Sequence, residues 1–456
     1  MNEELNRCAS RQKRFFILHS SFYIQGARRA GFLVAAFFIL HSSFFIPRVS
    51  AQNFIPQGGE HAPAGNLPGD QTFPQLSIAS SGGFIVWQDN ATDGNNGLGI
   101  SAQRLNSSLT QSGAPFRVNA QKTGDQEKPK VSLLNDGRAV FVWQGGKYGF
   151  QKIYARFLAP DGSFVARDVL VNTYKGGFQI NPAVATLADG SVVIVWSSFE
   201  QDGNLQGIFG QRFSATGAKL GGEFQVNQWT AGNQRTPAVA ALANGNFLVV
   251  WVSELQRGSA SVDVYGRIFN SSGVATGGEF PVNASAANLC ANPSVAGSPQ
   301  GGFAVAWSQN DNVTLGAGGN VTSVQSVTRS TNSWDVFGRL FDADGTTTTA
   351  PVRLNTTTYG DQYAPKINAL GGDYLAVWSS LGQDGSREGV YGRFLADNGD
   401  FTGPEFRVNT ATVSRQIDPA VAADGVNRFL VGWSSFVGGV GSFDSFAQKY
   451  LKTVVP

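Results

Sequence analysis

Few side chains of this sequence suit nucleophilic or metal chemistry. Its 456 residues include three His and two Cys, and Cys8, His19 and His41 lie in an N-terminal segment unlike the rest. Only His61 and Cys290 remain in the main part of the chain. A Ser-His-Asp or Cys-His mechanism, or a zinc site, needs more such residues. We therefore do not expect these activities.

Carboxylates are the other candidates for chemistry. Three Asp-Gly pairs follow a Trp by six positions, at Asp93, Asp202 and Asp384. They lack the alternating carboxylates and the closing Glu of a calcium loop. A turn is the expected role, a weak Ca²⁺ site is the alternative, and no other cofactor is expected. No pair of Asp or Glu stands out for sugar hydrolysis, so that activity stays open.

The N-terminal segment has the pattern of a secretory signal peptide. Basic residues precede an apolar run from Gly31 to Ile46, and Val49-Ser50-Ala51 gives a cleavage site of small residues. The pattern predicts a signal peptide over 1–51, with an uncleaved membrane anchor as the alternative. We expect a secreted protein, or one at the cell surface or in the periplasm, without stable membrane insertion after cleavage.

Net charge argues against a nucleic-acid partner. The whole chain carries +2, but its first 51 residues hold seven Lys/Arg and two Asp/Glu. The remaining chain is therefore acidic, at about −3. This removes the electrostatic support for binding nucleic acid or an anionic membrane.

A tryptophan repeats along the chain at intervals of about 55 residues, which is a period typical of propeller blades. Only the interval between the fifth and sixth positions is longer. The repeated residues are Trp87, Trp143, Trp196, Trp251, Trp307, Trp378 and Trp433. An indole at the same place in each copy indicates a packing role.

Each copy divides into four apolar runs separated by turns. The first begins at a proline, where a missing N–H costs no ladder bond, and the copies start near residues 74, 129, 182, 237, 293, 365 and 419. Such a pattern, without helical periodicity, predicts an all-β seven-bladed propeller of four-stranded antiparallel blades over 74–456. The last copy lacks its fourth run. We expect the segment 52–73 to close the ring, with residues near 53–58 as the missing outer strand.

Polar and small residues also recur in the copies. A glutamine stands three positions before most of the prolines, and an asparagine stands ten before; we expect both to bond the backbone at blade junctions. The glutamines are Gln71, Gln126, Gln179, Gln234, Gln362 and Gln416, and Cys290 occupies the remaining position. The third run carries a small residue such as Gly210 or Gly266, which we expect to admit the tryptophan indole.

Specific binding is expected where the copies differ. The fifth copy has an insertion between Trp307 and Phe341 on the face that bears the variable loops. The candidate ligand-binding residues there are Asp311, Asn312, Arg329, Trp334 and Asp335.

The repeat resembles one found in secreted bacterial proteins and large surface adhesins. The segment "NPAVATLADGSVVIVWSSFEQDGNLQGIFGQRFSATGAKLGGEFQVN" (181–227) carries the resemblance almost throughout, and similar copies span about 64–450. The resemblance implies an exported bacterial β-propeller, sometimes joined to calcium-binding or anchoring modules.

These observations favour an exported, non-catalytic binding or interaction module that takes a glycan or a protein on its loop-rich face. The first alternative is an extracellular carbohydrate-active hydrolase or lyase with a carboxylate pair at the channel mouth. The second alternative is a structural component of the cell surface. The sequence predicts no oligomeric state.

Overall fold

The computed structural model describes residues 54–65, 67–91, 97–310, 313–315, 321–324, 334–438 and 443–453. Residues 50–456 group into one compact unit, to which all described residues belong. Within these ranges the regular elements are strands, and no helix is present. None of the described segments forms a helix suited to crossing a membrane. The predicted signal peptide lies outside the described residues.

Four strands in chain order form each simple sheet. One sheet consists of β2 (Gln71–Ala79), β3 (Gly82–Asp89), β4 (Gly99–Leu105) and β5 (Phe116–Arg117). The next consists of β6 (Asp125–Leu133), β7 (Ala139–Gly146), β8 (Lys152–Leu158) and β9 (Val169–Leu170). A third consists of β10 (Gln179–Thr186), β11 (Val192–Phe199), β12 (Gln206–Phe213) and β13 (Lys219–Gln225). Another consists of β24 (Gln362–Leu370), β25 (Asp373–Leu381), β26 (Glu388–Ala396) and β27 (Phe406–Arg407).

Two further copies of the repeat share one eight-stranded sheet. The first supplies β14 (Gln234–Ala241), β15 (Phe247–Glu254), β16 (Val262–Phe269) and β17 (Phe280–Pro281). The second supplies β18 (Leu289–Gly297), β19 (Phe303–Asn310), β22 (Trp334–Phe341) and β23 (Val352–Arg353). A parallel pairing of Val262 with Leu289 joins them. The strands β20 (Val313–Leu315) and β21 (Val321–Val324) pair with each other.

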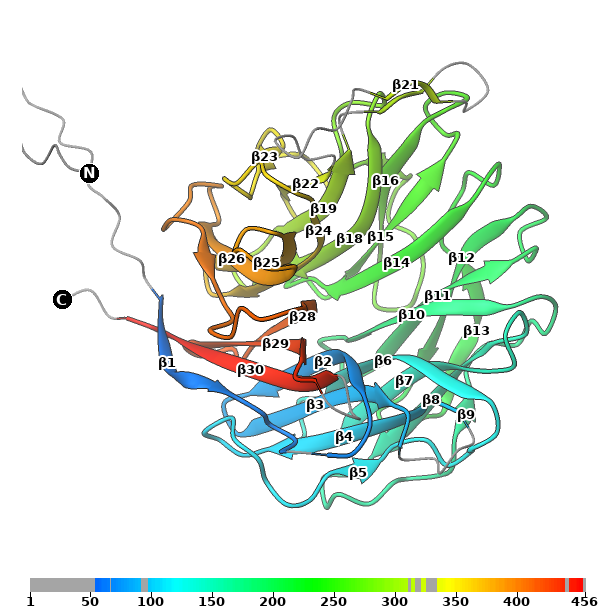
Figure 1. The fold of residues 1–456 in the computed structure, drawn as a ribbon. Coiled ribbons are helices and arrows are strands. Elements are labelled where there is room, and N and C mark those ends of the chain that lie inside the picture. The colour runs from blue at the N-terminus through cyan, green and yellow to red at the C-terminus, as the bar shows by residue number, and fades with distance from the viewer. Residues whose placement is uncertain are drawn as a thin grey trace, which may run out of the picture. The chain divides into compact units, whose positions relative to one another are not determined.

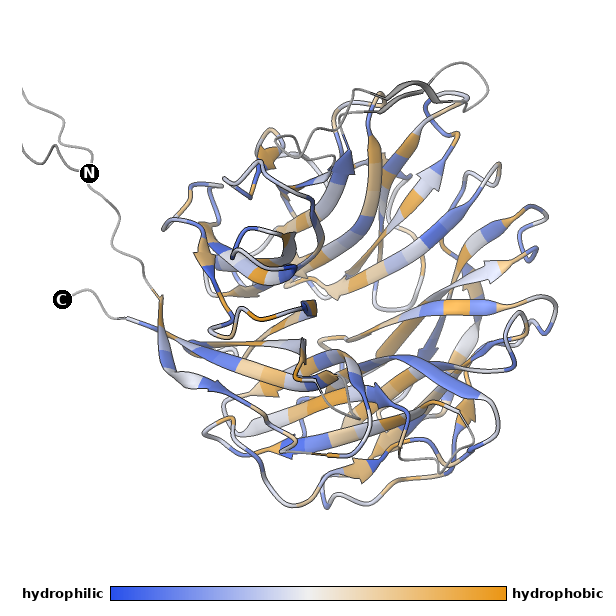
Figure 2. Cartoon of the chain, in the orientation of Figure 1, coloured by the Kyte–Doolittle hydropathy of each residue, from blue (hydrophilic) through white to orange (hydrophobic). Residues whose placement is uncertain are grey.

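The second strand of each copy is buried almost from end to end because its sequence is nearly continuous in apolar residues. In β15 every residue except Glu254 is buried. The repeated tryptophans lie in these strands with exposures of at most 1%. Figure 2 shows hydrophobic residues running along the strands within the sheets. Burial on both faces explains why these runs lack the alternation of a half-exposed strand.

The first strands of the sheets lie next to one another around a common centre (Figure 1). Each contacts the first strand of the following copy, and the last of them, β28 (Gln416–Ala423), contacts β2. Residues from opposite ends of the described chain are therefore brought to the same central region.

The N-terminal strand completes the last sheet. Its order is β1 (Phe54–His61), β30 (Phe443–Lys452), β29 (Arg428–Phe436) and β28. The strands β1 and β30 are antiparallel, with Phe54 opposite Lys452 and Gln57 opposite Lys449. The segment expected to supply the outer strand beside the last copy therefore does lie there.

The recurrent small residue of the third strand admits a different ring from the one predicted. A Cβ on Gly210 would lie 2.6 Å from the Phe224 ring, and one on Gly266 would lie 2.8 Å from the Phe280 ring. Both phenylalanines come from the fourth run of the same copy. The prediction that the tryptophan indole fills this space is wrong. Trp196 is opposite Phe209, one residue before Gly210, so its side chain lies on the other face of the sheet.

We predict that the seam between β1 and its neighbours contributes strongly to stability. Phe54 is fully buried and stacks on Phe394 at 4.7 Å between ring centroids. Phe54→Ala should lower the free energy of unfolding by about 3–5 kcal/mol, because it leaves a cavity. Chemical denaturation measures this change.

The matched control is Ile55→Ala in the same strand, where the side chain is 48% exposed. Its effect should stay within about 0.5 kcal/mol. Equal effects of the two substitutions would show that β1 is not packed as described.

Candidate active site

A ring of strained residues surrounds the centre of the molecule. The residue before each repeat proline is in the left-handed region, with φ between 51° and 55°. A residue before proline is sterically restricted, and left-handed φ is unfavourable for most side chains. These residues are Phe73, Lys128, Asn181, Thr236, Asn292, Ala364 and Asp418.

Hydrogen bonds between successive copies hold this strained backbone. The amide of Lys128 donates to Gln88 Oε1 at 3.0 Å, and that of Asn181 donates to Gln144 Oε1 at 2.8 Å. Thr236 and Ala364 donate in the same way to serine hydroxyls. Each acceptor directly follows a repeat tryptophan of another copy. Because these bonds recur around the ring, the strain is part of the scaffold.

The ring of left-handed residues surrounds a cavity of about 210 Å³, here called the channel mouth. It lies at the amino-terminal ends of the first strands β2, β6, β10, β14, β18, β24 and β28. A further cavity of about 380 Å³ continues along the same strands and shares Gln75, Lys130 and Lys366 with the mouth. Together they form a channel along the centre.

Charged groups gather on one side of the channel mouth. Among the described residues that line it, the charged ones are Lys128, Lys130, Lys366 and Asp418. The position after the proline is Ala183 or Ala238 in copies that lack this charge, whereas it is Lys130 and Lys366 in β6 and β24. The repeat pattern therefore breaks at the channel mouth.

Lys130 is poised to exchange a proton near neutral pH. Burial in the channel wall lowers the pKa of Lys130 to about 7, and the ammonium groups of Lys366 and Lys128 lower it further, while Asp418 opposes them. Its Nζ donates to Gln75 Oε1 at 3.0 Å. Burial also lowers the pKa of Lys366, although Asp418 counteracts this shift. A lysine with such a pKa can act as a base.

Asp418 faces the three lysines. Burial raises the pKa of Asp418, and the nearby Lys128 limits that rise. A neighbouring carboxylate, Glu388, is held differently. Arg415 donates to both oxygens of Glu388 at 2.9 Å. Burial alone would raise the pKa of Glu388, but the pairing with Arg415 lowers it.

The predicted ligand-binding residues of the fifth copy do not line the channel mouth where the structure describes them. The amide of Trp334 donates to Asp361 Oδ1 at 3.2 Å, and Asp335 accepts a hydrogen bond from Asn355. Both contacts anchor the start of β22. The other three candidates, Asp311, Asn312 and Arg329, lie outside the described residues.

The predicted calcium positions hold turns and side-chain amides. Asp202 accepts from Asn227 Nδ2 at 3.0 Å, and Asp384 accepts from the amide of Ser386 at 3.1 Å. Asp93 lies outside the described residues. Across the described ranges, no three His, Cys, Asp or Glu side chains gather in a way that could hold a metal ion.

The recurrent asparagines and glutamines bond the backbone around the blade junctions. Asn172 Oδ1 accepts the amide of Ile153 at 2.9 Å, and Asn172 Nδ2 donates to the Tyr174 carbonyl at 2.7 Å. The neighbouring Gln179 donates to the Gly176 carbonyl at 2.8 Å. Cys290, which replaces the glutamine in one copy, is also buried.

Carboxylates on the outer strands add a contact that sequence reasoning missed. The amide after the recurrent asparagine donates to a carboxylate of the following copy, as Thr173 does to Glu223 at 2.7 Å. In the last sheet Thr410 donates to Glu60 of β1 at 2.7 Å. The signal was in the sequence, because "GGEH" at 58–61 matches "GGEF" of the fourth run.

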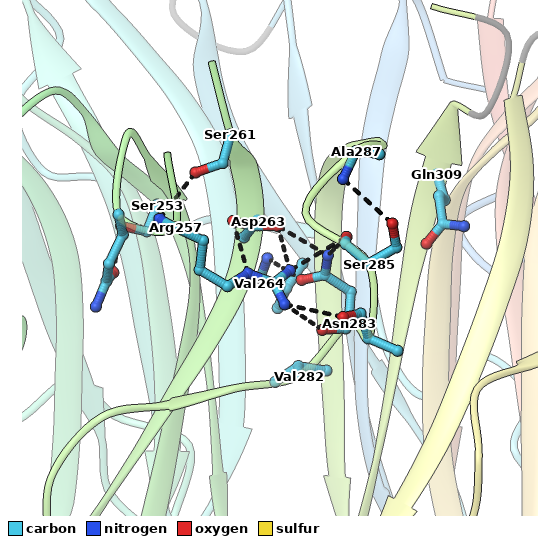
Figure 3. Close-up of polar contacts among 12 residues, drawn as sticks. Ser253, Arg257, Ser261, Asp263, Val264, Val282, Asn283, Ser285, Ala287 and Gln309 are labelled. Carbon is cyan, nitrogen blue, oxygen red and sulfur yellow. Dashed lines mark hydrogen bonds and ion pairs between the residues drawn. The ribbon is translucent and has the colours of Figure 1, made fainter. Parts of the chain in front are cut away.

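Arg257 is fully engaged, so it offers no free charge to a ligand. Its guanidinium pairs with Asp263 and donates to the carbonyls of Asn283, Ala284 and Ser285 (Figure 3). Asp263 also accepts from Asn283 Nδ2 at 2.9 Å. This cluster ties the loop after β15 to the connection that follows β17. The lysines of the channel mouth have no such set of partners.

Exposed aromatic side chains gather in the loops on the same face as the channel mouth. The loops between second and third strands, and the connections between copies, open on the side where the first strands begin. Among the described residues, each exposed aromatic side chain lies there: Tyr148, Phe150, Trp229, Tyr359 and Phe436. Tyr148 is 89% exposed and Phe150 is 64% exposed. Flat amphipathic rings around a polar cavity are typical of a ligand-binding face.

Solved structures identify the fold. A protein of unknown function from Dyadobacter fermentans shares 12% identity, over 88% of this chain and all of its own, with a TM-score of 0.50. The polysaccharide lyase Uly1 shares 11% identity, over 89% of this chain and 95% of its own, with a TM-score of 0.52. An α-L-arabinanase from Penicillium chrysogenum, complexed with arabinobiose, shares 13% identity over 70% of this chain and 92% of its own, with a TM-score of 0.48.

The fold is a β-propeller. Neither a family model nor a curated protein matches the sequence. No comparison therefore supports the resemblance to adhesin repeats.

The leading expectation, a non-catalytic binding or interaction module, is wrong. The solved structures similar to this chain include a polysaccharide lyase, Uly1. Sequence reasoning followed the insertion of the fifth copy and missed the charged groups of the channel mouth.

We predict that Lys130 makes stability depend on pH. Its pKa is about 7 in the folded protein against an ordinary value of 10.5. Between these values the unfolded chain binds a proton that the folded chain does not, so stability rises with pH across this window. Lys130→Met should be more stable than wild type below about pH 7. Its stability should lack the contribution of Lys130 to the rise with pH across this window.

Thermal denaturation between about pH 6 and about pH 10 measures the difference. Lys147→Met, on an exposed loop, is the control and should follow wild type. Parallel pH profiles of wild type and Lys130→Met would contradict the burial of this charge.

Proposed function

We propose that this protein is a polysaccharide-cleaving enzyme, a hydrolase or lyase, with its active site at the channel mouth. The observation that carries the proposal is the break in the repeat there. Lysines and an aspartate stand there at positions where most copies carry uncharged residues. Groups with shifted pKa values in a cavity are the usual mark of an active site.

The architecture we propose is a seven-bladed propeller closed by β1. The eight-stranded sheet then counts as two blades, joined by the pairing of Val262 with Leu289. In support, the first strands contact each other in chain order and β28 contacts β2. The signal-like segment over 1–51 supports export to the cell exterior, where a polysaccharide substrate would be met.

The exposed aromatic residues support a carbohydrate ligand. Tyr148 and Phe150 lie between β7 and β8, in the same copy as Lys128 and Lys130. Aromatic rings stack on the apolar faces of sugars, while the polar cavity binds their hydroxyl or carboxyl groups. A polymer lying across this face would reach the channel mouth with one of its sugars.

The first test is cleavage of a polysaccharide panel by the purified full-length chain. Neutral polymers such as arabinan and dextran, and acidic ones such as polygalacturonate, alginate and hyaluronate, are incubated with the protein. We expect new reducing ends from at least one polymer. Release of none by the wild-type protein would overturn the proposed function.

We also predict that the exposed aromatic loop contributes to substrate binding. The double variant Tyr148→Ala, Phe150→Ala should raise KM about tenfold, on the basis of about 0.5–1.5 kcal/mol for each ring, and should leave kcat little changed. Val274→Ala is the control, because Val274 is 60% exposed in the turn after β16, on the opposite side from the channel mouth. An unchanged KM in the double variant would place the substrate elsewhere.

A further inference from the structure

Resting on the proposed function, we propose that the substrate is an anionic, uronate-containing polysaccharide, cleaved at the channel mouth by β-elimination. In this scheme Lys130 is the base, and Lys128 and Lys366 bind the uronate carboxylate.

The charge of the channel mouth calls for an anion. Three lysines face one carboxylate, Asp418, within a cavity of about 210 Å³. Among the described residues, no ion pair involves any of these four groups. Half-buried ammonium groups without a counter-ion are costly, and an anionic ligand would relieve that cost. Lys128 Nζ lies 4.5 Å from the centre of the ring of Phe73, which also lines the cavity.

The backbone places these lysines together. The register of β6 against β7 shifts between Glu127 and Lys130, at the left-handed residue Lys128. Lys128 and Lys130 are two positions apart, and both line the same cavity. Lys366 enters from β24 and Asp418 from β28, which completes a cluster from three first strands.

Lys130 is the group best arranged to act as a base. Its Nζ is oriented by donation to Gln75 Oε1, and Gln75 in turn donates to the Pro74 carbonyl at 2.7 Å. The groups facing it are Gln75 of β2, Lys128 of its own strand, Lys366 of β24 and Asp418 of β28. Its pKa of about 7 supports this role, because much of the lysine is then a neutral amine near neutral pH.

The proposed step balances without a co-reactant. The lone pair of Lys130 Nζ takes the proton from C5 of the uronate, and the C5–H electron pair forms the C4=C5 double bond. The C4–O bond breaks, and its electron pair leaves with the glycosidic oxygen. Asp418 in its protonated form donates a proton to that oxygen. Lys128 and Lys366 stabilise the charge that develops on the carboxylate as C5 loses its proton.

A hydrolytic mechanism is less well served by the same site. Glycoside hydrolysis uses two carboxylates that flank the scissile bond. Among the described residues that line the channel mouth, Asp418 is the only carboxylate. The nearby Glu388 is already bound by Arg415 and accepts from the Tyr363 hydroxyl at 3.4 Å. Its oxygens are therefore committed to structure.

The test follows two products of the same reaction on the full-length chain. With an acidic polymer such as polygalacturonate, each new reducing end should be accompanied by one unsaturated uronate, measured by its ultraviolet absorbance. Activity on neutral polymers should be absent. The rate should rise with pH through about 7, because the base must lose its proton first.

Three variants assign the roles. Lys130→Met and Lys130→Arg should each lower kcat by about 10²–10⁴-fold, the usual range for a lost general base. The arginine keeps the positive charge, so a purely structural or charge role would leave its activity largely intact. Lys366→Met should raise KM for the acidic polymer. Arg138→Met, which removes a positive charge from the turn between β6 and β7, is the matched control and should behave as wild type.

Failure of this inference can be told from failure of the proposed function. Reducing ends without unsaturated product, or cleavage of neutral polymers alone, would overturn the elimination and leave an enzyme at this face. Retained activity in Lys130→Arg would also overturn it. A wild-type protein that cleaves no polymer would overturn both. Thermal denaturation of each variant confirms that a loss of activity is not a loss of fold.

Discussion

The pairing of β1 with β30 is the contact on which the rest of the structure depends. It completes the last sheet with a strand from the other end of the described chain. With that sheet complete, β28 lies against β2, and β2 lies against β6. Asp418 and Lys128 line the same cavity because of this arrangement, although nearly the whole propeller separates them in sequence. The contact of β28 with β2 therefore brings residues from both ends of the described chain to the candidate site.

Repeated polar contacts hold neighbouring copies in place. Residues that line the centre can therefore differ from copy to copy. Asparagine amides, outer-strand carboxylates and third-strand arginines all bond the backbone between or within copies; Arg156, for example, donates to the Val118 carbonyl at 2.7 Å. Such bonds satisfy buried backbone groups at every junction. The position that follows the proline makes such a bond in the fifth copy, where Ser294 accepts the amide of Ile367 at 3.2 Å, but its residue type varies among the copies and includes the two lysines.

The strand pattern was predictable from the sequence because it repeats. The tryptophan spacing, the prolines and the missing fourth run of the last copy indicate the strands, their order and the N-terminal strand beside β30. The channel mouth was not predicted, for a physical reason. A strand normally sends alternate side chains to opposite faces. That rule places Lys128 and Lys130 on one face, but it does not show that Lys366 of β24 and Asp418 of β28 line the same cavity.

The functional prediction failed because it followed the largest sequence difference between copies, the insertion of the fifth. The more informative differences are single residues at equivalent positions, such as Lys130, Lys366 and Ala183. Similarly, "GGEH" at 58–61 repeats the fourth-run pattern, and Glu60 makes the contact that this pattern makes in other copies.

The central claim is that the channel mouth is a binding and reaction site for an anionic sugar. A crystal structure of the Lys130→Met variant with a polygalacturonate oligosaccharide tests it most directly. The account predicts one uronate in the channel mouth, with its carboxylate within hydrogen-bond distance of Lys128 and Lys366 and its C4–O bond beside Asp418. An oligosaccharide bound elsewhere, or a channel mouth that stays empty at saturating oligosaccharide, would contradict the account.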